Sequence, residues 1–331
     1  MTQRSYKATG INLKAMPMGE SDRLVTVLTK ENGLVRASAP GARKHKSKLA
    51  GRSGLFVVND LLFIKGKSID KLVQAETQRS FPGLSKDLAK LTASQYLAEI
   101  VLSQALTGQP QEELYYLLIE HLSRLESASR STILPCLAQA TFHLLALAGV
   151  APEVFRCCLS RSLLTPTLGN PDWRAGFSVS SGGAIDMAEI ERIAGDRLEA
   201  KRAFARKDSL NATQKNGDTG GFKARVTKEL AAELGIVGYL SAAELALMQQ
   251  LSKPKLVMTG ASDGSQSNPR SGTQSGTIMT EADASLAESG PHLMWQHIEK
   301  FLRQYTQYQF DRPIRSAALI DICFTPLTHA S

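Results

Sequence analysis

Alternation of apolar and polar positions dominates the first 80 residues. Turn signals separate the alternating stretches at Pro17-Met18-Gly19, Glu31-Asn32-Gly33, Pro40-Gly41 and Gly66-Lys67-Ser68. The stretches between them predict five short strands, over residues 6–14, 23–29, 34–39, 55–65 and 69–77. Five strands with regularly spaced turns in so short a segment are typical of a small closed barrel, and we expect a five-stranded OB-type barrel.

From residue 84 onward the apolar positions repeat with the period of a helix. The spacing predicts helices over 84–105, 114–125 and 133–148. The third is apolar on most faces, as the central helix of a bundle would be, and its polar members argue against a membrane span. His121 lies on the apolar stripe of the second helix, where we expect a packed histidine without a metal. The predicted fold class is therefore α+β, a barrel followed by an all-α helical bundle.

Beyond Pro152 the periodic signal weakens. We expect loops over 159–187 and 213–221, helices over 185–205 and 227–250, and a final helix after Pro291 that buries Trp295, followed by a tail over 313–331. Residues 259–291 are rich in Ser, Gly and Thr, which is typical of disorder. The predicted domains are an OB domain over 1–80, a helical domain over 81–250, a disordered insertion over 251–291, and a segment 292–331 that returns to the helical domain.

The positive charge is concentrated in the predicted barrel. The chain of 331 residues carries 39 Lys and Arg against 31 Asp and Glu, a net charge of +8. Residues 1–80 hold 15 Lys and Arg against six Asp and Glu, a balance of +9, and the remainder is close to neutral at −1. This asymmetry indicates a module that binds polyanions, joined to a second module of different function.

The densest basic stretch is the segment 41–52, which contains no acidic residue. We expect it to be a mobile loop between strands that contacts phosphates, although a solvated loop that only aids solubility would have the same composition. The residues predicted to contact nucleic acid are Arg23, Arg36, Arg43, Lys44, His45, Lys46, Lys48, Arg52, Lys65 and Lys67.

Common catalytic and cofactor motifs are missing from the sequence. It contains no GxxxxGK[ST], GxGxxG or HExxH segment and no dense carboxylate cluster, so we expect neither an enzyme nor a cofactor. Cys157 and Cys158 are adjacent, and neither cysteine nor histidine follows over 159–200, which argues against a zinc site. Four cysteines without framework spacing, and an N-terminus without an apolar signal segment, favour a cytoplasmic protein.

Residues 10–56 resemble the N-terminal barrel of the bacterial RecO family of recombination mediators. The most specific phrase is Gly19-Glu20-Ser21-Asp22-Arg23, with further matches at Gly33-Leu34-Val35-Arg36 and at 39–44. Residues 75–103 resemble the junction into the helical domain of that family, and the segments around 301–303 and 315–316 match more weakly. Many family members hold four zinc-binding cysteines after a turn like 149–153. This chain keeps only Cys157-Cys158, and has Ser180–Gly183 where the second pair would stand, so a degenerate zinc-module loop is expected over 153–190.

The resemblance implies a protein that binds single- and double-stranded DNA and anneals complementary strands. It also implies action with RecR on DNA coated by single-strand-binding protein, so that RecA can load, in the cytoplasm at the nucleoid and without a membrane. Two alternatives stay open from the residues alone: an RNA-binding OB-fold protein, and a nucleic-acid enzyme with an unrecognised site. No metal site and no catalytic residue is predicted.

Overall fold

The computed structural model describes residues 5–208, 219–254, 256 and 281–324. The chain forms two compact units, one made of residues 1–151 with 302–331 and the other of residues 152–301. The predicted separation of a binding domain at residue 80 stays a prediction, because barrel and first helices belong to the same unit.

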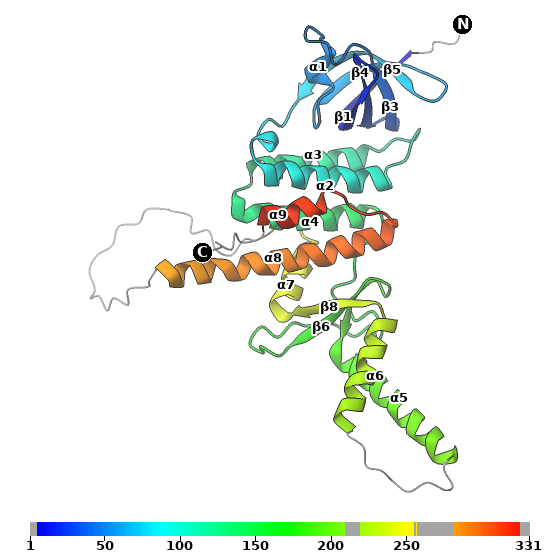
Figure 1. Ribbon diagram of the computed structural model, residues 1–331, viewed down its shortest axis with the longest axis vertical. Coiled ribbons are helices and arrows are strands. Elements are labelled where there is room, and N and C mark those ends of the chain that lie inside the picture. Colours follow the sequence, from blue (N-terminus) through cyan, green and yellow to red (C-terminus); the bar gives the residue numbers. More distant parts are fainter. Residues whose placement is uncertain (1–4, 209–218, 255, 257–280, 325–331) are drawn as a thin grey trace, which may run out of the picture. The chain divides into compact units, whose positions relative to one another are not determined.

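The first unit begins with a closed barrel, which confirms the predicted five strands (Figure 1). The strands are β1 Ser5–Met18, β2 Asp22–Thr29, β3 Gly33–Ala39, β4 Val58–Ile64 and β5 Asp70–Arg79. They follow one another around the barrel in the order β1-β2-β3-β5-β4. The long β1 closes it by pairing with β4 over Ser5–Ile11 and with β2 from Gly10 to Met18, across an irregularity between Asn12 and Lys14.

Alternate residues of the strands fill the barrel. Val25 and Val27 of β2, Leu61 and Phe63 of β4, and Leu72 of β5 belong to one buried cluster. Their neighbours in sequence point outward, as the pleat of a strand requires. The alternation that predicted the strands therefore also identifies the core.

Helices complete the first unit, and the three predicted between 84 and 148 are confirmed. They are α2 Leu88–Gln104, α3 Glu112–Ser127 and α4 Ile133–Leu147, with short 3₁₀ turns at Leu84–Lys86 and Arg130–Thr132. Asp87 caps α2 by accepting hydrogen bonds from the backbone of Ala89 and Lys90 at 2.8 and 3.2 Å. The predicted tail is wrong over residues 317–324, which form helix α9 Ala317–Phe324, packed on α2 through its apolar positions.

Backbone hydrogen bonds join the barrel to the helices. The turn between β2 and β3 exchanges bonds with the loop between α2 and α3: Leu34 N to Leu106 O at 2.8 Å and Gly108 N to Asn32 O at 2.9 Å. Gly33 has a φ of +62°, and a Cβ at this position would lie 2.0 Å from the Leu106 carbonyl oxygen. The close approach therefore requires glycine.

The second unit contains a sheet that the sequence pattern did not indicate. Three antiparallel strands lie in the order β7-β6-β8, with β6 Arg174–Ser178, β7 Gly183–Asp186 and β8 Ile236–Ser241. The loop expected over 159–187 is thus wrong for β6 and β7, and the helix expected over 227–250 is broken by β8. These strands are short, and they contain Gly176 and Gly238 where the side chains of Ile236 and Phe301 leave no room for a Cβ. They therefore lack the usual strand composition.

The remaining helices of the second unit are α5 Met187–Asp208, α6 Thr219–Glu233, α7 Ala242–Gln250 and the larger part of α8 Glu281–Phe310. The final helix begins at Glu281, so residues 281–291 belong to it and not to a disordered insertion; Trp295 is buried, as predicted. Residues 255 and 257–280 of that insertion, and 213–218 of the expected polar loop, lie outside the described residues. Within the described parts of the chain, no helix is long and apolar enough to cross a membrane.

Candidate nucleic-acid interface

The basic segment 41–52 leaves β3 through a turn fixed by hydrogen bonds. Gly41 N donates to Asp22 Oδ1 at 2.8 Å, and Arg43 N donates to Ser21 O at 2.8 Å, so the segment is tied to the turn between β1 and β2. Its last residues form the short helix α1 Leu49–Arg52. The expected loop is therefore wrong over residues 49–52, which are helical, and the mobility of the rest stays a prediction.

Two buried asparagines hold the far end of the segment. Asn12 Nδ2 donates to the carbonyl oxygens of Arg52 and Gly54 at 2.8 and 3.0 Å, and Asn59 Nδ2 donates to the Arg52 carbonyl at 2.9 Å. Both amides are almost completely buried, in strands of the barrel wall. The barrel thus fixes the position of the segment through its backbone.

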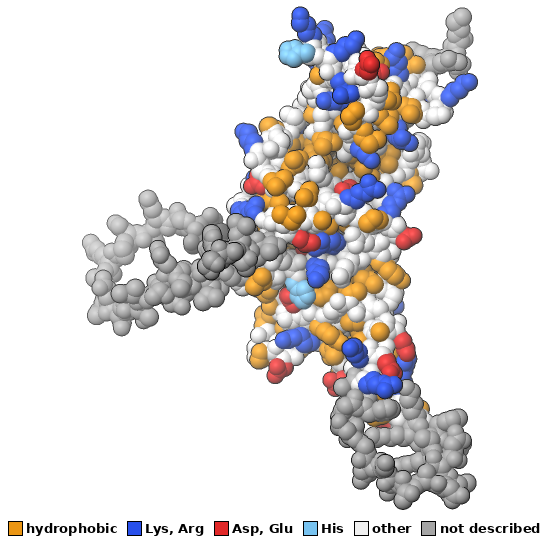
Figure 2. All heavy atoms as spheres, in the orientation of Figure 1, with side chains coloured by type: hydrophobic (Ala, Val, Ile, Leu, Met, Phe, Trp, Pro, Cys, Tyr) orange, Lys and Arg blue, Asp and Glu red, His pale blue; other side chains and the backbone are white. Residues whose placement is uncertain are grey.

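Between these anchors the basic side chains are exposed, and Arg43 Nη1 also donates a hydrogen bond to Gly19 O at 2.9 Å. Arg43, Lys44, His45, Lys46 and Lys48 are all exposed. Figure 2 shows Lys, Arg and His side chains gathered on the barrel at the end that carries α1. These five predicted residues therefore form one surface, which we call the loop cluster.

Arg23 and Arg52 are partly buried and help to position the segment. Arg23 Nη1 donates to Ala50 O at 2.8 Å and to Ser53 Oγ at 3.0 Å, and Arg52 Nη1 donates to Ala75 O at 2.5 Å. Sequence reasoning placed both among the contacts to nucleic acid because of their charge. Their hydrogen bonds show that both arginines also hold this segment in place, and their contact with nucleic acid stays a prediction.

The other predicted cations line a groove of about 890 Å³, which we call the seam groove. It lies where the barrel closes by only two parallel residue pairs between β3 and β5, Ala37 with Asp70 and Ser38 with Lys71. Arg36 comes from β3, and Lys65 and Lys67 come from the turn between β4 and β5. Sequence reasoning predicted all three without bringing them together.

The wall of the seam groove combines an aromatic ring with neutral and acidic groups. The Tyr6 hydroxyl donates to Asp70 Oδ2, and Gly66 N donates to Asp70 Oδ1 at 2.9 Å. Burial, followed by the neighbouring Asp70 carboxylate, raises the pKa of Tyr6 above its usual value, so its phenol stays protonated at neutral pH. Leu34 and Val35 add apolar surface.

Lys71 connects the two groups of cations, and sequence reasoning missed it. The backbone N–H of Gly41 and the Ser21 hydroxyl lower the pKa of Asp22, and the charges of Lys44 and Lys71 lower it further. A lysine of the loop cluster and a lysine beside the seam groove therefore lie near the same carboxylate. The signal in the sequence was the alternation of β5, where exposed Lys71 precedes buried Leu72.

Acidic groups occupy a different face of the barrel. A smaller groove of about 380 Å³ on β1, β4 and the second half of β5 is lined by Glu31, Asp60 and Glu76 together with Lys7. Asp60 accepts hydrogen bonds from the Thr9 hydroxyl at 2.8 Å and from Gln78 Nε2 at 2.5 Å. Positive and negative charges are therefore separated on the barrel. The cations lie along β3 and in the loop cluster, and the acids lie on the β1–β4 face.

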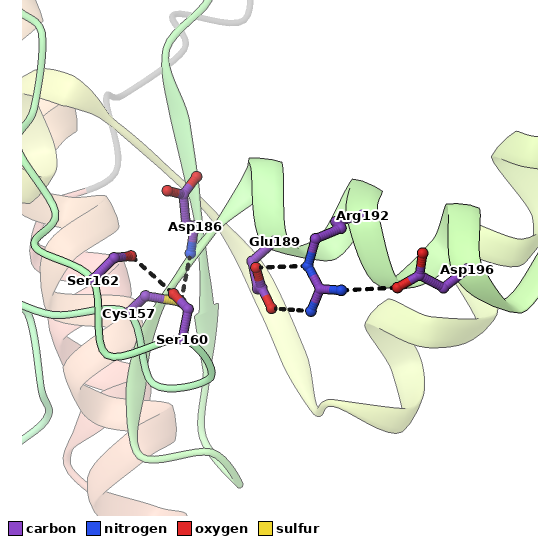
Figure 3. A network of polar contacts seen from close by, with 7 residues as sticks. All are labelled: Cys157, Ser160, Ser162, Asp186, Glu189, Arg192 and Asp196. Atoms are coloured by element: carbon purple, nitrogen blue, oxygen red, sulfur yellow. Dashed lines mark hydrogen bonds and ion pairs between the residues drawn. The ribbon is translucent and has the colours of Figure 1, made fainter.

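The cysteine loop of the second unit does not have the donor set of a zinc site. Cys157 Sγ accepts a hydrogen bond from Asp186 N at 3.3 Å (Figure 3). Burial opposes ionisation of Cys157, but hydrogen bonds from Ser160, Asp186 and Leu159 outweigh it and lower the pKa of the thiol. Burial and the neighbouring Cys157 raise the pKa of Cys158 to about 11.

The serines in place of a second cysteine pair have another partner. The hydroxyls of Ser178, Ser180 and Ser181 all donate to the Leu234 carbonyl beyond the end of α6. Across the described residues, no three His, Cys, Asp or Glu side chains come together as metal ligands. The residues present do not fit a zinc ion.

A closed barrel in this strand order, with a cationic groove at β3 and the β4–β5 turn, defines an OB-type barrel protein suited to polyanions. Comparison with known families agrees. Residues 1–81 match the N-terminal model of recombination protein O, and residues 85–218 match its C-terminal model.

Curated relatives match over nearly the whole chain. A protein of a Nostoc species called DNA repair protein RecO is 48% identical over 325 residues, covering 97% of both chains. Proteins of the same name from Acaryochloris marina and Gloeobacter violaceus are 46% and 37% identical, covering 98% and 99% of this chain and 97% of each relative. The chain belongs to the RecO family of DNA repair and recombination proteins.

Proposed function

We propose that this protein is a recombination mediator that binds single- and double-stranded DNA and anneals complementary strands, without enzymatic turnover. The observation that carries the proposal is the set of exposed cations in the loop cluster, at Lys71 and along the seam groove. Membership of the RecO family supplies the role in DNA repair and recombination. The geometry supports the binding part of that role.

The location of the cations fits binding along the nucleic-acid backbone. OB barrels hold oligonucleotides on the face of their second and third strands and on the loop between the fourth and fifth. Arg36, Lys65 and Lys67 occupy these places, and Tyr6 is the aromatic side chain in the groove wall. Since few aromatic rings are available for stacking, binding should be mainly electrostatic and should not depend on sequence.

Annealing follows from the same surface. Two DNA strands repel each other, and a cationic surface that neutralises phosphates lowers this repulsion while the bases find their partners. The loop cluster extends into solvent on fixed anchors, so it can contact a strand without unfolding the barrel. The protein would then act with RecR on DNA coated by single-strand-binding protein, which lets RecA load, in the cytoplasm at the nucleoid.

The test replaces Arg43, Lys44, Lys46 and Lys48 with alanine. Binding of a labelled thymidine 20-mer should weaken, and the slope of log affinity against log salt should fall by about 3, since each lost phosphate contact contributes about 0.7. The annealing rate of two complementary 40-mers should fall with it. Fluorescence anisotropy and energy transfer measure the two quantities.

A variant with Lys7, Lys86 and Lys228 replaced by alanine is the control, because these exposed lysines lie outside the cationic surface. Equal binding by the loop variant and the native protein at 0.1 M salt would refute the proposal. Much tighter binding of the matched RNA strand, without annealing, would favour an RNA-binding protein instead. Cleavage or ligation that requires a divalent metal would indicate an enzyme.

A further inference from the structure

A second groove lies within the first unit, between the barrel and the helices, which we call the junction groove. It measures about 660 Å³. One wall is the second half of β1 with Leu55, and the other is formed by α2 and the turn between α8 and α9. Figure 2 shows hydrophobic side chains gathered over the barrel and the adjoining helices, with Lys and Arg among them.

The floor of the junction groove is apolar and its rim is cationic. Met16, Leu55 and Phe310 are exposed or partly exposed along it. Lys14 stands on the barrel wall, and Arg312 and Arg315 stand on the opposite wall. All three cations are exposed, and within the described part of the chain none forms an ion pair.

The one acidic residue lining the groove already has partners. Glu99 Oε2 accepts a hydrogen bond from Arg315 N at 2.6 Å, and Glu99 Oε1 accepts one from Ser316 N at 3.2 Å. The carboxylate thus fixes the backbone of the turn that carries Arg315. Its charge is partly offset there by two backbone dipoles, and the groove remains attractive to anions.

Strand order places the junction groove away from the seam groove. Around the closed barrel, β1 is separated from β3 by β2 and from β5 by β4. The second half of β1, which forms this wall, is therefore separated from the β3–β5 seam by β2 and β4, whereas Ser5 and Tyr6 at the start of β1 reach the seam groove. The two grooves share no lining residue.

We propose that the junction groove binds a second single strand of nucleic acid, with phosphates on Lys14, Arg312 and Arg315 and bases against Met16, Leu55 and Phe310. A nucleotide has an anionic and an apolar part, and the groove presents a cationic rim above an apolar floor. The inference rests on the proposed function and extends it: one protein would hold two strands, one in each groove.

The experiment compares the native protein with a variant that carries Lys14→Ala, Arg312→Ala and Arg315→Ala. Donor- and acceptor-labelled thymidine 20-mers, mixed in equal amounts, report through energy transfer when two strands share one protein. The affinity for the first strand should change less than about threefold, while the energy-transfer signal falls. The slope of log affinity of the second strand against log salt should fall by about 2, since three phosphate contacts are lost at about 0.7 each. Annealing of bare complementary 40-mers should slow on the order of tenfold.

The variant with Lys7, Lys86 and Lys228 replaced by alanine removes the same charge and should retain both signals. Unchanged energy transfer and annealing would overturn the inference, as would an equal loss of first-strand affinity, since the groove would then belong to the first site. Loss confined to strands coated by single-strand-binding protein would overturn it too and would assign the groove to a peptide. The variant with Arg43, Lys44, Lys46 and Lys48 replaced by alanine tests the proposed function separately, because its expected effect is a loss of affinity for the first strand.

Discussion

At the scale of single residues, the most unusual group is a pair of histidines, one of which is buried. His121 of α3 is 2% exposed, and its Nε2 lies 3.1 Å from Nδ1 of His143 on α4. Burial first, then the charges of His143 and Arg124, lower the pKa of His121 to about 3. The sequence correctly predicted a packed histidine, but its partner lies on another helix, so no local spacing could reveal it.

The low pKa of His121 should make stability depend on pH. Because the unfolded chain binds a proton near pH 6.5 and the folded chain does not, the unfolding free energy should decrease as pH falls from 6.5 toward 3. The contribution of His121 is about 1.4 kcal/mol per pH unit within that window, and it is fully present above pH 6.5. Urea denaturation at pH 7, 6 and 5 measures it.

His121→Gln retains a hydrogen-bonding side chain and removes the titration. Its unfolding free energy should therefore vary less between pH 7 and pH 5 than that of the native protein. Parallel pH profiles for the two proteins would contradict the assignment.

At the scale of elements, the connection between barrel and helices depends on one turn. The turn between β2 and β3 is bonded to the loop between α2 and α3, and next to it Lys30 Nζ donates to the Tyr116 hydroxyl at 3.0 Å. Gly33 lies at the centre of this contact, where a side chain has no room. The turn thus aligns the cationic barrel with the first helices.

Comparing Gly33→Ala with Gly19→Ala should separate the cost of backbone strain at a positive φ from the cost of a steric clash. Gly19 has the same φ of +62°, but nothing lies within 4 Å of a Cβ there, so Gly19→Ala should cost only the backbone strain of about 1–2 kcal/mol. Gly33→Ala adds a clash with the backbone of Leu106 and should cost clearly more. Equal losses in thermal or urea unfolding would show that the contact at Gly33 can relax.

The elements that the sequence predicted well are those whose pattern is local. Barrel strands alternate along their own length, and α3 carries a complete stripe from Leu114 to Leu125, so both follow from the sequence. Strand β8 was missed because Gly238 is chosen for its contact with Phe301, far away in the chain. The hydrogen bonds of Arg23 and Arg52 could not be predicted for the same reason, since charge is visible in a sequence and the hydrogen-bond partner of a charge is not.

At the scale of the whole molecule, counting charged residues in the sequence was enough to show that the positive charge lies in the barrel and that the remainder is nearly neutral. The division within the barrel was not, because Glu31, Asp60 and Glu76 are far apart in sequence and meet only on the folded surface. The acidic face marks a side of the barrel that nucleic acid should avoid. It therefore directs a strand toward β3 and the loop cluster.

Neutralising the acidic face should show this direction. In a variant with Glu31→Gln, Asp60→Asn and Glu76→Gln, hydrogen-bond acceptors are retained and three negative charges are lost. We expect somewhat tighter binding of the thymidine 20-mer at low salt, with a salt slope changed by less than about 0.7, the value of one phosphate contact. A slope larger by a full contact or more would mean that nucleic acid now uses this face.

The two asparagines beneath the basic segment have a practical consequence. Asn12 and Asn59 donate hydrogen bonds to the backbone carbonyl oxygen of Arg52, a group that every amino acid possesses. These bonds therefore do not depend on which side chains stand from Lys44 to Lys48. Those positions can be exchanged, shortened or given a reporter dye while the barrel keeps its shape. The affinity for DNA and the stability of the fold can thus be changed independently. This segment is therefore a suitable place to engineer the protein.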